Sequence, residues 1–401
     1  MNLIAVTDNL ANVGGAELSA QTIIKELCSR SDINNIKLIG VDIASESHLD
    51  FGDAQVIPVN IPEQVERLPA LAADLIIKKL LAREIQDQNE SADLIHAHHR
   101  RSALALSGIE TSAKTIATVR DYWPVCPIST YSVAGERCTG CGDRLDDCIS
   151  QNELDGYSRT GTKAYLLAKR KHQRQVLSSV DCAVFIANHL RDRMSNSMEL
   201  PPQTTVVYNP VSMDTDIDPA SLTFPTFVTA SSLTKSKGIE TAIRAVGSLT
   251  DQYPNCRLIV FGDGPDYDRL ERVAGVHAPQ SIEFRGRVPT SEVYDSIAGA
   301  TATIFPSLWE EPFGRITVES MMLGTPVIGS DVGGIAELIN DGVNGLLFSP
   351  GDSTGLEDRL QTIIQEEELR KRLSSKGESF SRQFRPERIA DNHMAVYSDR
   401  L

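Results

Sequence analysis

Short apolar runs alternate with longer stretches of helical period along most of the chain. Each run has the length of a buried strand, and most runs are followed by a helix-like stretch. The predicted strands are 3–7, 36–41, 94–98, 115–119 and 183–186 in the first half, and 226–230, 257–261, 282–285, 302–305 and 326–329 in the second. Strands that alternate with helices predict parallel sheets joined by right-handed crossovers, so we expect an α/β fold.

The length of 401 residues suits two domains of ordinary size. Residues 209–225 (NPVSMDTDIDPASLTFP) combine turn formers with acids, such as Asp214 and Asp216, and predict a linker. We predict an N-terminal domain over 1–210, a C-terminal domain over 211–385, and a final helix over 386–401 that packs back on the first domain. The two doubly wound domains would face each other across a cleft, where small-molecule sites concentrate.

The charge and the opening of the chain narrow the class of partner and the compartment. The net charge is −15, and both halves are acidic, which argues against a nucleic-acid partner. The opening MNLIAV lacks the basic region and cleavage pattern of a signal peptide, and no apolar run approaches the length that spans a bilayer. We therefore expect a cytoplasmic protein.

One basic stretch is compatible with two interpretations. Residues 159–174 contain six Lys or Arg side chains and no acid, with Leu166 and Leu167 among them. A basic amphipathic helix of this kind can lie on an anionic membrane, which would suit peripheral contact at the inner membrane face and a lipid-linked acceptor. The same pattern also fits a core helix with a solvated basic face.

The most informative chemistry lies between residues 305 and 352. Glu311 and Glu319 are separated by seven residues, and Pro312 holds Glu311 out of helical conformation. Gly314 allows a ligand to approach the backbone closely, and a helix is predicted over 315–323. Its start would present unpaired N–H groups and a positive dipole end. This arrangement suits a diphosphate flanked by two polyols. The two carboxylates would accept hydrogen bonds from the hydroxyls of those polyols.

The segment 305–352 resembles the donor-binding signature of glycosyltransferase family 4, the retaining enzymes of the GT-B fold (glycosyl transferases group 1). The resemblance rests on its PS, EPFG, GTPV, GG and NG elements, and the stretches GGAELSA, DLIHAHHRRS, LIVFGDGPDYDRL and IEFRGRVP also match. It implies two Rossmann-like domains, the first for the acceptor and the second for the donor. The implied reaction moves a hexose-type sugar from a UDP- or GDP-sugar to an acceptor hydroxyl with retention, in polysaccharide, glycolipid or glycoconjugate synthesis.

The resemblance also implies roles for residues of the second domain. Glu311 would contact the transferred sugar, Glu319 the ribose, and Val288 the base. The remaining donor-binding residues implied are Ser232, Phe313, Gly314 and Arg315. Lys237 stands where a fixed ammonium could stabilise charge on the leaving diphosphate, although a solvated lysine would have the same sequence. With Lys237 and a helix dipole replacing a cation, we predict transfer that needs no metal or other catalytic cofactor.

In the first domain the candidates lie after predicted strands. Gly14 and Gly15 precede a helix, where N–H groups can meet a phosphate. By resemblance, His98 would lie near the reacting sugar and the acceptor, whereas His96 fits a hydrogen-bonded core residue. Arg120 stands where many family members carry histidine, and it would bind a donor phosphate or an anionic acceptor. A second departure is Ser231-Ser232, where Gly-Arg is usual.

Four cysteines gather in an insertion over about 121–155. Cys126, Cys138, Cys141 and Cys148 have the spacing C-x11-C-x2-C-x6-C, and the Cys138–Cys141 knuckle suits a tight turn that directs two thiolates at one metal. Four sulfur ligands predict a structural zinc. An iron–sulfur cluster uses the same ligands, and unliganded thiols are a third interpretation.

Two other functions stay open. A non-catalytic nucleotide-sugar-binding scaffold is suggested by the departures at Ser232 and Arg120 and opposed by the intact Glu311, Glu319 and Lys237. An enzyme of the same fold that cleaves glycosidic bonds with phosphate is disfavoured, because no cofactor-lysine motif is visible.

Overall fold

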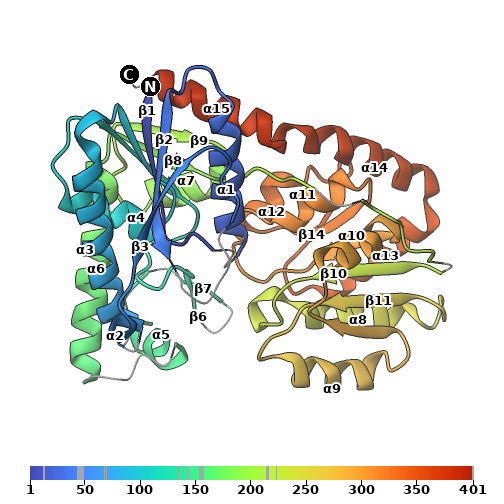
Figure 1. Ribbon diagram of the computed structural model, residues 1–401. Helices are drawn as coiled ribbons and strands as arrows, with labels where there is room; N and C mark the ends of the chain where they lie inside the picture. Colours follow the sequence, from blue (N-terminus) through green and yellow to red (C-terminus); the bar gives the residue numbers. More distant parts are fainter. Residues whose placement is uncertain are drawn as a thin grey trace. The chain divides into compact units, whose positions relative to one another are not determined.

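The structure of the protein is a computed structural model. The structure describes residues 1–11, 14–42, 49–66, 68, 70–133, 136–138, 140–142, 144–152, 158–213, 216–222 and 224–399, so Asp214 of the predicted linker lies outside the described residues. The chain divides into two units (Figure 1). Unit 1 comprises 1–131, 139–212 and 384–401, and unit 2 comprises 132–138 and 213–383.

Unit 1 is built around a seven-stranded parallel sheet with the order β3-β2-β1-β4-β5-β8-β9. Its strands are β1 Asn2–Thr7, β2 Asn35–Asp42, β3 Gln55–Asn60, β4 Leu94–Ala97, β5 Lys114–Val119, β8 Cys182–Phe185 and β9 Gln203–Val206. The order runs one way from β1 to β3 and the other way from β4 to β9. The reversal lies between β1 and β4, and ligands of open parallel sheets bind beside such a point.

Helices cover both faces of this sheet, with α3 and α6 on one side and α1 on the other (Figure 1). The helices of unit 1 are α1 Gly15–Cys28, α2 Glu63–Glu66, α3 Ala70–Gln88, α4 Arg100–Ala105, α5 Leu145–Gln151, α6 Arg159–Ser179, α7 Asn188–Ser195 and α15 Pro386–Ser398, with 3-10 turns at Asn89–Ser91 and Leu106–Gly108. Among the described helices, no segment combines the length and the hydrophobicity that crossing a bilayer requires.

The last helix of the chain, α15, belongs to unit 1. It lies against α1 (Figure 1), and Ile389, Ala390 and Tyr397 join the apolar core that β1 and α1 form. The Tyr397 hydroxyl reaches the His96 ring of β4 at 2.7 Å. The chain therefore crosses to unit 2 and returns, and its final helix completes the first core.

Unit 2 contains a six-stranded parallel sheet with the order β12-β11-β10-β13-β14-β15. Its strands are β10 Thr226–Ala230, β11 Arg257–Phe261, β12 Ile282–Gly286, β13 Ala302–Phe305, β14 Val327–Ser330 and β15 Leu346–Phe348. The order reverses between β10 and β13. An antiparallel pair, β6 Ser132–Val133 and β7 Glu136–Arg137, forms a separate two-stranded sheet.

The helices of unit 2 also flank their sheet, with α8 and α9 on one side and α10, α11 and α12 on the other (Figure 1). They are α8 Ile239–Leu249, α9 Tyr267–His277, α10 Thr290–Gly299, α11 Arg315–Met322, α12 Gly333–Leu338, α13 Ser353–Gln365 and α14 Glu367–Ser381, with 3-10 turns at Lys235–Lys237 and Arg382–Phe384. The predicted α/β class with two doubly wound parallel sheets is thus confirmed.

Every predicted strand is present to within a few residues. The pattern did not predict the short pair β6 and β7, nor β3, β9 and β15 of the two parallel sheets. The last three lie at sheet edges. Most side chains of β3 and β9 are exposed or half-buried, and β15 is only three residues long. An edge strand has one neighbour and needs no continuous apolar run, so its sequence signal is weak.

Candidate functional site

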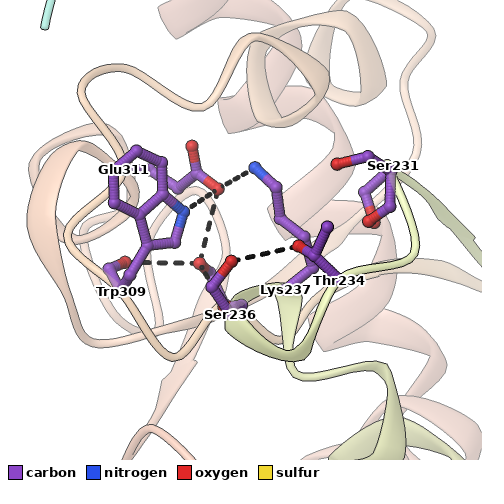
Figure 2. Close-up of polar contacts among 8 residues, drawn as sticks. Ser231, Thr234, Ser236, Lys237, Trp309 and Glu311 are labelled. Carbon is purple, nitrogen blue, oxygen red and sulfur yellow. Dashed lines mark hydrogen bonds and ion pairs between the residues drawn. The ribbon is translucent and has the colours of Figure 1, made fainter. Parts of the chain in front are cut away.

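The reversal between β10 and β13 in unit 2 places two charged side chains together. Lys237 ends the 3-10 turn that follows β10, and Glu311 lies in the loop that follows β13. Their side chains form an ion pair that spans 74 positions of sequence (Figure 2). The Glu311 side chain is 9% exposed and that of Lys237 is 20% exposed. Such a shielded pair is screened little by salt.

One oxygen of Glu311 accepts all the side-chain bonds that hold it. Besides Lys237, the Trp309 indole donates to Oε1 at 2.7 Å and the Ser307 hydroxyl at 3.4 Å. Within the described chain no hydrogen bond ends on Oε2, which points away from these donors (Figure 2). The carboxylate is therefore oriented through one oxygen, while the other retains its capacity to accept from a ligand hydroxyl.

The two loops that carry this pair pack tightly. Gly238 has φ 65°, and a Cβ there would lie 2.0 Å from the Pro306 carbonyl oxygen. The Leu308 N–H donates to the Ser236 carbonyl at 2.8 Å, and the Ser307 hydroxyl also approaches that carbonyl at 3.4 Å. Glycine is required at 238 because any side chain would separate the loops.

Glu319 lies one turn inside α11, which begins at Arg315 after Gly314 in left-handed conformation (φ 85°). The predicted helix over 315–323 is confirmed to within one residue. Arg315 Nε donates to Glu319 Oε1 at 2.7 Å, and the carboxylate is largely buried. The pKa of the neighbouring Tyr294 is raised, chiefly by burial and also by Glu319. Glu319 therefore lies at the start of a helix, as predicted, and Arg315 fixes one of its carboxylate oxygens.

A cavity of about 580 Å³ opens at the carboxyl ends of β10, β11 and β12. It brings together Ser232 and Val288, two residues expected to bind the donor, and Arg287 also lines it. Gly262 makes the approach of the first two strand ends possible, because at φ 113° a Cβ would lie 1.8 Å from the Ser231 carbonyl oxygen. The cavity has the polar backbone edges and small apolar side chains that suit a planar heterocycle.

The corresponding edge of unit 1 carries the other predicted residues. Gly14 is the N-cap of α1, after β1, and Gly15 is the first residue of that helix. His98 follows β4, is fully buried, and has no described hydrogen-bond partner for either ring nitrogen. Arg120 follows β5 and is also buried. These residues lie at the ends of three neighbouring parallel strands, beside the reversal between β1 and β4.

His96, one position inside the same strand end, has a different environment. Its two ring nitrogens bond the hydroxyls of Tyr397 and Thr118, each at 2.7 Å. The expectation that His96 is a hydrogen-bonded core residue is confirmed. Burial lowers its pKa well below the usual range for histidine, with smaller contributions from His393 and Arg120.

The predicted zinc site is not supported. The four cysteines all fall among the described residues, and in that part of the chain no three His, Cys, Asp or Glu side chains are grouped to hold a metal ion. Cys148 is buried in α5, whereas Cys138 and Cys141 are partly exposed. Cys126 Sγ accepts from the Tyr131 N–H at 3.4 Å. An iron–sulfur cluster would need the same gathering of thiolates.

The sequence did not predict the residues that orient the charged groups. Trp309 and Ser307 lie within the segment that carries Glu311, and Asn209 lies at the predicted domain boundary. Tyr294 lies on α10, which contacts α11. A Trp two positions before a candidate carboxylate was the available signal, because an indole N–H needs an acceptor when it is partly buried.

Sequence comparison links unit 2 to a known family. Residues 215–380 match the model of the family described as glycosyl transferases group 1. An uncharacterized glycosyltransferase of Methanocaldococcus jannaschii is 31% identical over 54% of this chain and 57% of its own length. The N-acetyl-alpha-D-glucosaminyl L-malate synthase of Bacillus anthracis is 31% identical over 43% of this chain and 44% of its own length. The chain thus spans about half the length of the curated relatives that it matches.

Solved structures match the whole chain. Anabaena HepE, crystallised in complex with UDP, has a TM-score of 0.69 and 17% identity over 100% of both chains. Sucrose-phosphate synthase from Thermosynechococcus elongatus has a TM-score of 0.74 and 17% identity over 100% of this chain and 99% of its own. At this identity the likeness establishes the fold alone, and the predicted GT-B fold is confirmed.

Proposed function

We propose that the protein is a retaining glycosyltransferase that moves a sugar from a nucleotide-diphosphate sugar to an acceptor hydroxyl. The observation that carries the proposal is the oriented Glu311–Lys237 pair at the strand reversal of unit 2. It lies in the part of the chain that matches glycosyl transferases group 1. A carboxylate with one free oxygen suits a sugar hydroxyl, and an ammonium beside it suits a diphosphate.

Each donor-side residue then has a distinct role. Oε2 of Glu311 accepts from the transferred sugar, and Lys237 stabilises the charge that develops on the leaving diphosphate. Glu319 accepts from the ribose. The cavity with Ser232 and Val288 takes the base. The backbone around Phe313, Gly314 and Arg315 lines the sugar and phosphates, where the start of α11 adds a positive dipole end.

The first domain supplies the acceptor side in this proposal. His98 lies near the reacting sugar, and Gly14 and Gly15 at the start of α1 offer N–H groups to a phosphate. The acceptor hydroxyl attacks from the face of the leaving group, and a diphosphate oxygen takes its proton. Because Lys237 can provide the positive charge at the diphosphate, we propose that transfer needs no divalent metal.

The donor and acceptor are proposed only as classes. HepE was crystallised with UDP and with UDP-glucose, which favours UDP over GDP as the first donor to test. A saccharide or lipid-linked acceptor fits a cytoplasmic enzyme that contacts the inner membrane face through α6. That helix exposes Leu167 and Lys171, while Arg159 and Lys163 pair with Asp146 and Lys169 pairs with Asp74.

Ligand-dependent thermal stability tests the proposal first. UDP, GDP, ADP, dTDP and CMP, with their sugar conjugates, would be compared in the presence and absence of EDTA. A nucleotide at 100 times its Kd should stabilise the folded state by about 2.7 kcal/mol, a shift of several degrees. Donor turnover that survives EDTA supports the metal-independent reaction. Loss of turnover that magnesium restores would contradict it, and no shift with any nucleotide would contradict the donor site itself.

A non-catalytic scaffold is the second candidate. Ser231 and Ser232 line the base cavity where Gly-Arg is usual in the resembling family, so one expected phosphate ligand is missing. A scaffold would show the nucleotide shift without transfer or donor hydrolysis. Restoring the usual pair with Ser231→Gly and Ser232→Arg would then be expected to gain affinity for the diphosphate but no turnover.

A further inference from the structure

Unit 1 contains a buried arginine whose bonds leave its charge uncompensated. Arg120 follows β5 and is 7% exposed. Its Nε donates to the His98 carbonyl at 2.9 Å, and its Nη1 donates to the Asn209 side-chain oxygen. Nη2 is buried and has no hydrogen-bond partner within the described chain. Both partners of the guanidinium are therefore neutral, and one nitrogen has none.

Buried arginines in proteins are almost always paired with an anion, because removing a guanidinium from water is costly. The neighbour that favours the charged form of Arg120 is Glu17 in the first turn of α1, yet burial outweighs it and lowers the pKa of Arg120 to about 10. The group is still charged at neutral pH. A hydrogen-bonding anion is what this environment lacks.

His98 adds a second set of unsatisfied atoms at the same place. Its ring is fully buried, its carbonyl accepts from Arg120, and neither ring nitrogen has a described partner. Burial, with contributions from His96 and Arg120, lowers its pKa well below the usual range, so the ring is neutral and offers one N–H donor. The guanidinium of Arg120 therefore bonds the backbone of His98 and acts on its imidazole, and Glu17 in the first turn of α1 acts on the guanidinium.

We propose that Arg120 and His98 form a binding site for an anionic group, a carboxylate or a phosphate, on a substrate of the transfer reaction. The proposal rests on the proposed function. The free guanidinium nitrogen and the imidazole are donors that match carboxylate and phosphate oxygens. A neutral hydroxyl would satisfy the hydrogen bonds but would leave the buried charge uncompensated. The substrate group is therefore acidic.

The first experiment uses inorganic phosphate and needs no donor. Phosphate should raise the thermal midpoint of the full-length wild-type protein in a saturable way. Arg120→Gln should lose this response, and Arg120→Lys, which keeps the charge, should retain part of it. Arg83→Gln is the control, because Arg83 lies on the same unit with its side chain 81% exposed. An equal response in wild type and Arg120→Gln overturns the proposal, since the response would then come from other groups, such as the diphosphate site proposed at Lys237, or from non-specific salt effects.

The second experiment separates the donor from the acceptor as the source of the anion. On whichever nucleotide binds, a hexose conjugate is compared with the matching hexuronate. If the donor sugar carries the charge, Arg120→Gln should weaken hexuronate binding by about 10- to 100-fold and hexose binding by much less. If the acceptor carries the anionic group, phosphate and L-malate, a carboxylate probe, should still stabilise the protein when UDP is saturating. Competition between UDP and phosphate that is lost in Arg120→Gln assigns the Arg120 site to the donor diphosphate.

Failure of this inference can be distinguished from failure of the proposed function. If no nucleotide binds but phosphate still protects through Arg120, the anion site stands and the transferase proposal falls. If a nucleotide sugar binds and turns over equally well in Arg120→Gln, for hexose and hexuronate alike, the transferase stands and the anion site falls. A folded Arg120→Gln protein that loses neutral and anionic ligands to the same extent also overturns the proposal, because a structural role then explains the loss.

Discussion

The indole of Trp309 should contribute to catalysis although it touches no reacting atom in our proposal. Its Nε1 donates to Glu311 Oε1 at 2.7 Å, beside Lys237, whose ammonium lies 5.5 Å from the ring centroid. Trp309→Phe removes the N–H and keeps an aromatic face for the ammonium. Glu311 keeps two of its three donors, so the carboxylate stays in place but turns more freely (Figure 2).

A hydrogen bond to a charged group contributes about 1.5–3 kcal/mol, and part of this is recovered by water in the variant. We therefore expect Trp309→Phe to lower kcat by about 10-fold, which corresponds to about 1.4 kcal/mol. The KM for the donor should change little, because the base and ribose contacts are untouched. Ser307→Ala removes a longer bond, 3.4 Å, and should lower kcat by only about 2- to 3-fold, since such a bond is weaker.

The assay is steady-state transfer with the donor that the stability screen identifies, together with UDP or GDP affinity measured by calorimetry. Unchanged kcat in Trp309→Phe would refute the orienting role of the indole. Equal losses of kcat and of nucleotide affinity would also refute it, because they would indicate that the ring supports the loop by packing. The larger effect in Trp309→Phe than in Ser307→Ala is the pattern that the hydrogen-bond geometry requires.

Three further outcomes follow from the same contacts. Glu311→Ala should raise the barrier to transfer by about 2–4 kcal/mol, measured as kcat, and near-normal turnover would remove Glu311 from the mechanism. Glu319→Ala should raise the donor KM more than it lowers kcat, whereas a fall in kcat alone would contradict the ribose contact. Burial lowers the pKa of His96, His98 and His393, the last to about 3. Below about pH 6.5 these three rings therefore become protonated in the unfolded chain but stay neutral in the folded chain. Between neutral pH and pH 5.5 the free energy of unfolding should fall by about 1 kcal/mol per histidine. His393→Gln should reduce this dependence on pH, measured by denaturant titrations at each pH.

Much of the fold could be predicted because the information is local. Strands buried on both faces, such as β10 and β11, appear as continuous apolar runs, and their alternation with helices indicates parallel sheets. The edge strands β3 and β9 have no such run, and their position depends on a neighbour far away in sequence. The sequence predicts a final helix that packs back on the first domain, but the contact of Tyr397 with His96 of β4 appears only in the tertiary structure.

The candidate site was predictable in its components and not in its pairings. The spacing of Glu311 and Glu319 was visible, but the contact of Glu311 with Lys237 joins residues 74 positions apart. The cysteines show the opposite case. Their spacing fits a zinc knuckle, yet spacing along the chain sets no distance between thiols, and Cys148 is held in α5, where it is buried. A ligand set needs convergence in space, and among the described residues no three such side chains are grouped to hold a metal ion.

The cations at the two strand reversals have different partners: Lys237 pairs with an anion, whereas Arg120 bonds neutral groups. This difference affects the stability of the folded protein. In unit 2 the ammonium of Lys237 already has the carboxylate of Glu311, so that site is electrically balanced without a ligand. In unit 1 the hydrogen-bond partners that the described residues offer to the guanidinium of Arg120 are neutral, and the acid that acts on it, Glu17, is not among them. Removing one member of a buried pair leaves a charge uncompensated, whereas removing an unpaired buried charge relieves a desolvation penalty. Lys237→Gln should therefore lower the free energy of unfolding of the ligand-free protein more than Arg120→Gln does. A buried cation without an anionic partner is costly, and it is worth retaining only if a ligand supplies the anion. If Arg120→Gln lowered the free energy of unfolding more than Lys237→Gln, the protein itself would already compensate the charge of Arg120, and no ligand would be needed.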